Sequence, residues 1–142
     1  MPFVVDGSVA VSWFFEDETT PETEALRDAL ADDTELAPDH WALEVANALV
    51  VGFRRGRMVA EDLGMAVDLL RALPIELDAE TSVHAWSATL ELALRHHLSV
   101  YDAAYLELAL RTGLALATLD SALAKAAARE RVRLIGPLAR RR

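Results

Sequence analysis

The chain has 142 residues and a mass of 15.5 kDa, and 53% of its residues are hydrophobic while 26% are charged. This composition fits one compact domain over residues 1–142 and excludes a disordered chain. The absence of cysteine excludes disulfides, thiolate metal sites and cysteine nucleophiles. Because the start has no basic n-region and no run of about 18 apolar residues occurs, we expect a cytoplasmic protein without a membrane span, ending in a short flexible tail.

Charge is distributed unevenly along the chain. Residues 1–48 hold 12 acidic residues and one basic residue, whereas residues 49–142 hold 11 acidic and 13 basic residues, which gives a net charge of −9. A negative chain does not attract a polyanion through its overall field. RNA would have to be bound locally, and the available cations are Arg54, Arg55, Arg57 and the three C-terminal arginines at 140–142. The alternatives are a solvated helix end for the first group and a frayed tail for the second.

Short apolar runs alternate with helix-like segments along the chain. In chain order we expect strands at about 3–5, 36–37, 75–77, 114–118 and 132–135. Between them we expect helices at about 9–15, 21–31, 40–55, 60–72, 79–96, 99–112 and 121–128. This alternation predicts an α/β domain of three layers, with a central, mostly parallel sheet of four or five short strands between helices.

Apolar residues at helical spacing predict which helix faces point inward. For the segment 40–55 these residues are Leu43, Ala46, Val50 and Phe53, and for the segment 79–96 they are Val83, Trp86, Leu90 and Leu94. The aromatic run 13–15 could stack on bases, but core packing is the favoured interpretation.

Four acidic residues stand apart from the solvated acidic runs. Asp6 follows the first strand and Asp120 follows the 114–118 strand, and ligands of parallel sheets bind outside the carboxyl ends of the strands. Glu44 and Asp102 lie on helical segments with apolar flanks. Four converging carboxylates repel one another unless a cation neutralises them, and oxygen-only ligands select Mg²⁺ or Mn²⁺. Such a cluster predicts metal-dependent hydrolysis of phosphodiesters.

A structural interpretation of the same acids stays open at this point. Asp6 and Asp120 could be helix caps, and Asp102 could be the acidic half of a capping box opened by Ser99. Glu44 could be a partly exposed helix residue. A phospho-acceptor receiver domain is excluded, since Asp6 has no acidic neighbour and the only lysine is Lys125.

Four ordered segments resemble the PIN-domain family, and within it the VapC toxin ribonucleases of toxin–antitoxin pairs. They are 4–9 with Asp6 and Ser8, 43–49 with Glu44 and Asn47, 98–105 with Asp102, and 116–123 with Thr118 and Asp120. The resemblance implies an endoribonuclease whose Mg²⁺ or Mn²⁺ is held by Asp6, Glu44, Asp102 and Asp120, with Ser8, Asn47 and Thr118 supporting these acids. It also implies a homodimer inhibited by a cognate antitoxin. An RNA-processing PIN nuclease without an antitoxin and a catalytically silent PIN module are the alternatives.

One position departs from the family pattern. Some PIN domains carry a further acid two residues past the position of Asp120, where this chain has Ala122. The departure leaves open whether one or two metal ions bind.

Overall fold

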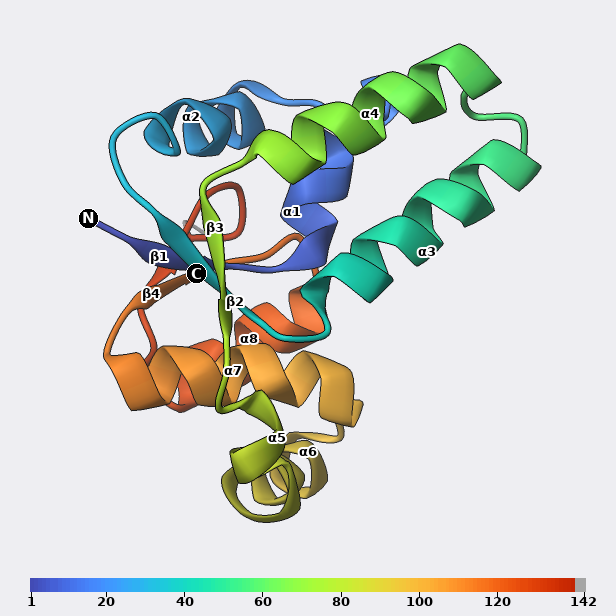
Figure 1. The fold of residues 1–142 in the computed structure, drawn as a ribbon. Helices are drawn as coiled ribbons and strands as arrows, with labels where there is room; N and C mark the ends of the chain where they lie inside the picture. The colour runs from blue at the N-terminus through green and yellow to red at the C-terminus, as the bar shows by residue number, and fades with distance from the viewer. Residues whose placement is uncertain (140–142) are drawn as a thin grey trace.

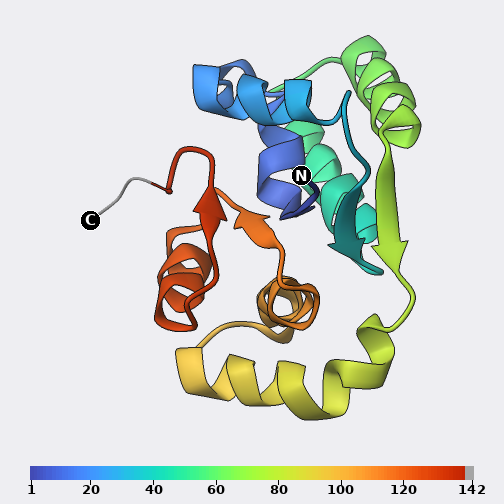
Figure 2. The ribbon, with the colours of Figure 1, turned by 90° about the vertical axis from the view of Figure 1, so that its left-hand side faces the viewer.

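A computed structural model describes residues 1–139 as one α/β unit around a five-stranded parallel sheet. The sheet has the order β3-β2-β1-β4-β5, so β1 lies at its centre (Figures 1 and 2). The strands are β1 (Phe3–Val5), β2 (Glu35–Pro38), β3 (Ile75–Asp78), β4 (Ala115–Ala117) and β5 (Leu134–Ile135). The expected fold class and strand positions are therefore confirmed, while the three C-terminal arginines and the expected tail lie outside the described residues.

Helices cover both faces of the sheet. Those on one side are α1 (Gly7–Ser12), α2 (Pro21–Ala29), α3 (Trp41–Arg54) and α4 (Ala60–Ala72), with the 3₁₀ turn η1 (Glu16–Glu18) between α1 and α2. Those on the other side are α5 (Thr81–His84), the π-helix η2 (Ala85–Thr89), α6 (Leu90–His96), α7 (Val100–Thr112) and α8 (Ser121–Arg129) (Figure 2). In the part of the chain that the structure describes, none of these helices combines the length and apolarity needed to cross a membrane.

The central strand is buried because it is paired on both sides. Val4 faces Leu36 of β2 and Leu116 of β4 in the parallel register, and all three residues of β1 are buried. The aromatic residues that follow β1 join this core. Trp13 donates its indole N–H to the Thr23 carbonyl at 2.7 Å, so core packing of this run is the interpretation that the structure supports.

The predicted inward faces of two helices were wrong. In α3 the buried residues are Trp41, Val45 and Leu49, while Leu43 is 77% exposed, because the true stripe follows a spacing of four from Trp41. The predicted helix 79–96 is interrupted by η2, and its expected inward residues point outward, with relative exposures of 68% for Val83, 86% for Trp86, 41% for Leu90 and 72% for Leu94. A π-helical turn adds a residue to the turn and so rotates the face of everything that follows it.

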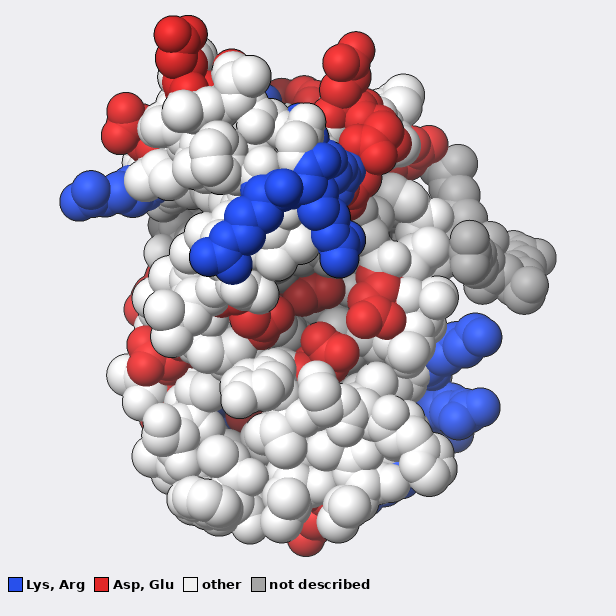
Figure 3. Space-filling model, turned by 90° about the vertical axis from the view of Figure 1, so that its right-hand side faces the viewer, with Lys and Arg blue, Asp and Glu red and all other residues white. Residues whose placement is uncertain are grey.

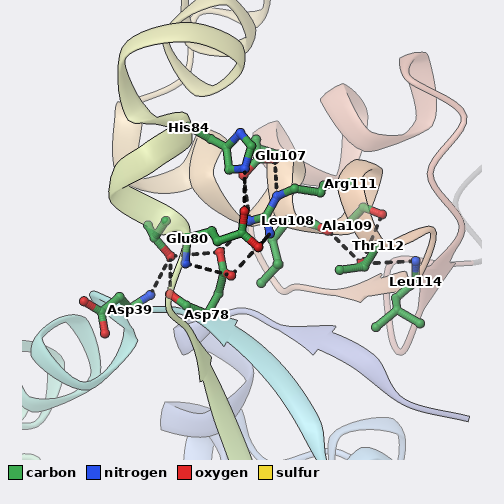
Figure 4. A network of polar contacts seen from close by, with 11 residues as sticks. Asp39, Asp78, Glu80, His84, Glu107, Leu108, Ala109, Arg111, Thr112 and Leu114 are labelled. Carbon is green, nitrogen blue, oxygen red and sulfur yellow. Dashed lines mark hydrogen bonds and ion pairs between the residues drawn. The ribbon is translucent and has the colours of Figure 1, made fainter.

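A network around Arg111 ties α7 to the end of β3 and the start of α5 (Figure 4). Its guanidinium donates to Asp78 Oδ2 at 2.5 Å and to Glu107 Oε2 at 2.9 Å, and it lies 3.9 Å from Glu80 Oε2. Glu80 Oε1 in turn lies 3.5 Å from His84 Nε2. We call these five residues the Arg111 clasp.

Candidate active site

Asp6 is the fixed point of the site because the main chain and two hydroxyls hold it at the end of β1. Its backbone N–H donates to the Ala117 carbonyl, which continues the pairing of β1 with β4. Ser8 Oγ and Thr118 Oγ1 each donate to Asp6 Oδ2 at 2.7 Å. The carboxylate is only 4% exposed and does not cap the helix that follows it, so the helix-cap interpretation does not explain its position.

Burial raises the pKa of the Asp6 carboxyl from 3.8 to about 6. The hydrogen bonds from Thr118 and Ser8 oppose this rise, whereas the negative charges of Glu44 and Asp102 add to it. Asp6 therefore sits among like charges that make its own ionised form costly.

The same hydroxyls connect Asp6 to Asp120. Thr118 Oγ1 accepts the Asp120 backbone N–H at 3.0 Å, and Ser8 Oγ accepts the Leu119 N–H at 3.0 Å. Asp120 Oδ1 caps α8 by accepting the N–H groups of residues 122 and 123, so the predicted capping role of Asp120 is real. Capping occupies one oxygen only, and the second is available for another ligand.

Asp102 and Glu44 complete the group from two helices, α7 and α3. Burial and the charge of Asp120 raise the pKa of the Asp102 carboxyl, the charge of Glu44 adds to the rise, and contacts with Ser99 and His40 oppose it. The Asp102 backbone N–H donates to Ser99 Oγ at 3.1 Å, which is one half of the predicted capping box. Glu44 Oε1 lies 2.5 Å from His40 Nε2.

We call Asp6, Glu44, Asp102 and Asp120 the acidic cluster. Figure 3 shows acidic side chains lining a hollow on this face of the molecule, with basic side chains along its upper rim. Among the described residues, no arginine or lysine forms an ion pair with any member of the cluster. Each pKa rise in the cluster is due partly to the charge of another member, so the four acids share one electrostatic environment.

Oxygen-only carboxylate donors of this kind match the preference of Mg²⁺ and Mn²⁺. Over residues 1–139, no three histidine, aspartate or glutamate side chains lie close enough to hold one ion as they stand. The tied oxygens explain the separation: Asp6 Oδ2 is held by two hydroxyls, Asp120 Oδ1 by α8, and Glu44 Oε1 lies against His40. The remaining oxygens of the four acids would hold a divalent cation after side-chain rotation.

The other predicted site residues have different environments. Ser8 and Thr118 contact the cluster as described, whereas Asn47 lies exposed one turn beyond Glu44, with no side-chain hydrogen bond within the described chain. Arg54 and Arg55 are exposed at the end of α3. Arg57 is engaged within the chain, because it donates to Asp17 at 2.7 Å and Glu18 at 2.8 Å and lies over the Phe15 ring at 4.1 Å.

Two residues of the site carried no recognisable sequence signal. His40 is four residues before Glu44 and Tyr105 three residues after Asp102, spacings that place each on the same helical side as its acid. Tyr105 is fully buried, its pKa is raised by burial and by the charges of Asp6 and Glu44, and its hydroxyl has no hydrogen-bond partner in the described chain. The hydroxyl lies 3.7 Å from the position of a Cβ built on Gly7.

Comparisons with known proteins agree with this architecture. A family model described as "PIN domain" matches residues 3–129. Ribonuclease VapC3 of Pyrobaculum aerophilum is 35% identical over 130 residues, covering 88% of this chain and 94% of that protein. Ribonuclease VapC3 of Mycobacterium tuberculosis is 34% identical over 125 residues, covering 87% of this chain and 85% of that protein. The crystal structure of PAE2754 from Pyrobaculum aerophilum superposes with a TM-score of 0.61 at 19% identity, over 89% of this chain and 84% of that one.

Proposed function

Since this chain belongs to the PIN domain family, we propose that it is a metal-dependent endoribonuclease that hydrolyses RNA phosphodiester bonds. We propose further that it is the toxin of a toxin–antitoxin pair, acts in the cytoplasm and is inhibited by its cognate antitoxin. Two relatives at 34–35% identity bear the name Ribonuclease VapC3, which supports both parts of the proposal.

The observation that carries the proposal is the acidic cluster without a protein counter-charge. Four acids from four separate segments raise one another's pKa in a shared hollow, an arrangement that is unfavourable unless a ligand offsets it. A bound Mg²⁺ or Mn²⁺ would supply the positive charge that stabilises the phosphoryl oxygens and activates water.

The chain's own residues would orient this chemistry. Ser8 and Thr118 hold Asp6 Oδ2, which leaves Oδ1 directed to the ligand. Asp6 must lose its proton before it can bind a cation, so with a pKa of about 6 the site becomes competent as the pH rises above that value. The exposed Arg54 and Arg55 are placed to contact RNA phosphates or an antitoxin.

RNA cleavage with Mg²⁺ or Mn²⁺ tests the proposal directly. We expect Asp6→Asn and Asp102→Asn to lose cleavage by more than a hundredfold while staying folded, since each removes a charged ligand of almost the same shape. Asp68→Asn, an exposed acid on α4, is the matched control and should cleave as wild type. Equal cleavage by wild type and both site variants would reject the catalytic assignment, and no cleavage by any protein would favour the silent PIN module.

The toxin role needs a separate experiment. Expression of the chain alone should arrest bacterial growth, and co-expression of a small DNA-binding protein encoded beside it should restore growth. An RNA-processing nuclease without an antitoxin would show cleavage but no such rescue.

We also propose a homodimer. The exposed apolar residues of α5, η2 and α6, with Trp86 at 86% exposure, offer a surface for a second copy. Sedimentation equilibrium should give twice the monomer mass, and Trp86→Glu should shift the protein to monomer; an unshifted mass would place the interface elsewhere.

A further inference from the structure

His40 contacts the acidic cluster from outside it. It directly precedes α3, and its Nε2 lies 2.5 Å from Glu44 Oε1, with 19% of the side chain exposed. Both atoms are shielded from solvent and neither makes another hydrogen bond in the described chain. The contact is thus a close pair by distance, although its angles differ from those of a straight hydrogen bond.

The imidazole is fixed from the side of α7. Its ring centroid lies 5.6 Å from that of Tyr101 at an interplanar angle of 60°, and 5.5 Å from that of Tyr105 at 73°. These two tyrosines flank Asp102 in the sequence, so one histidine ring spans the gap between the helix that carries Glu44 and the helix that carries Asp102.

Glu44 Oε1 needs a donor at this position. A shielded carboxylate oxygen without a hydrogen-bond donor is costly, and the His40 Nε2–H is the nearest group that can supply one. Both the protonated imidazole and its Nε2–H tautomer carry this proton, so the argument does not depend on the charge of His40. Occupation of Oε1 by His40 leaves Oε2 as the oxygen that faces the other acids.

We propose that His40 is a positioning residue that holds Glu44 in the orientation needed to bind a divalent cation. The inference rests on the proposed function, since it assigns His40 to the same metal site. A purely structural alternative is that the ring only fills space between α3 and α7, and this alternative predicts a different response to substitution.

The test is calorimetric titration of the folded protein with Mn²⁺ in the absence of RNA. His40→Leu keeps apolar bulk but removes the donor, and we expect its Mn²⁺ dissociation constant to rise about 10- to 100-fold, as for loss of a partner that orients a metal ligand. His40→Gln places an amide N–H near the position of Nε2 and should stay within about threefold of wild type. In cleavage assays the Leu variant should show a higher KM for Mn²⁺ with a smaller change in kcat.

A second pair of variants keeps the test decisive if His40→Leu does not fold. The amide of His40→Asn is too short to reach Glu44, so Asn should lose affinity where Gln retains it. Wild-type affinity in both the Leu and Asn variants, or an equal loss in Gln and Asn, would overturn the inference and leave the proposed function intact. Failure of the wild-type protein to bind Mn²⁺ at all would instead overturn both.

Discussion

The acidic cluster and the Arg111 clasp contain the same type of side chain at the same edge of the sheet, yet their carboxylates behave in opposite ways. Asp6 follows β1 and Asp78 ends β3, two strands that run parallel in the sheet. Burial raises the pKa of Asp6 to about 6, and neighbouring charges add to the rise. Burial also acts to raise the pKa of Asp78, but its contacts with Arg111, the Glu80 N–H and Thr81 outweigh this and hold it below the usual value.

The difference separates structural acids from functional ones. In the clasp, Arg111 supplies the positive charge and the acids join β3, α5 and α7. In the acidic cluster, the described chain supplies no cation beyond His40, which contacts a single member. Buried acids left without a counter-charge destabilise the fold and are retained where a ligand uses them.

The largest expected effect is on the clasp. Arg111→Met should lower the free energy of unfolding by about 3–5 kcal/mol, because it leaves Asp78 and Glu107 buried without a partner. Urea unfolding measures the loss. Adding Asp78→Asn and Glu107→Gln to this variant should recover at least half of it, and a loss of less than about 1 kcal/mol for Arg111→Met would show that the clasp is not structural.

The acidic cluster should respond to pH in the opposite sense. The folded pKa of Asp6, about 6, exceeds its ordinary value of 3.8, so the folded chain holds this proton more tightly than the unfolded chain does. Without metal, the stability contributed by Asp6 should therefore fall as the pH rises from about 4 to 6, by about 3 kcal/mol at about 1.4 kcal/mol per pH unit. Unfolding in chelator across this range measures it.

Asp6→Asn is the control for that profile. The amide oxygen can still accept from Ser8 and Thr118, so the variant should be more stable than wild type at pH 7.5 and should lack the decline. An identical decline in the variant would assign it to another group.

Metal should reverse the cost in the acidic cluster alone. At 100 times its dissociation constant, Mn²⁺ should add about 2.7 kcal/mol to the stability of wild type and of Arg111→Met. Asp6→Asn should gain far less. Thermal unfolding with Mn²⁺ or chelator provides the measurement, and equal gains in all three proteins would locate the ion outside the cluster.

The smallest expected effect is at Thr118, which is 1% exposed. Thr118→Val keeps the shape but removes the donor to Asp6 and the acceptor for the Asp120 N–H, so it should cost about 1–2 kcal/mol and raise the pKa of Asp6 further. Carboxyl chemical shifts followed by NMR titration report the pKa. Thr112→Val, on an exposed helix end, should change stability by less than about 0.5 kcal/mol, and an unchanged Asp6 pKa in Thr118→Val would contradict the assigned role.

The strands and the positions of Asp6 and Asp120 were predictable because local signals agree with the fold. Apolar runs closed by polar or turn residues mark each strand end, and the parallel topology brings those ends together. The inward faces of α3 and of residues 81–96 were not predictable in the same way. A one-residue error in phase turns a stripe toward solvent, and the sequence around Ala85–Thr89 carries no recognisable signal for a π-helix.

The contacts around Glu44 were hidden for a different reason. His40 and Tyr105 acquire their roles only when α3 and α7 lie against each other, and no periodicity in the sequence reports that neighbourhood. The Arg111 clasp likewise joins residues 33 apart, so its ion pairs follow from the tertiary fold.

The central place of β1 affects how the protein is born. The first strand emerges from the ribosome early, but one of its two neighbours is made more than a hundred residues later, since 112 positions separate Asp6 from Thr118. At about 5–20 residues per second, the gap lasts on the order of ten seconds. Catalytic competence is therefore the last property that a nascent molecule acquires, and an inhibitor translated just beforehand could meet it as it folds.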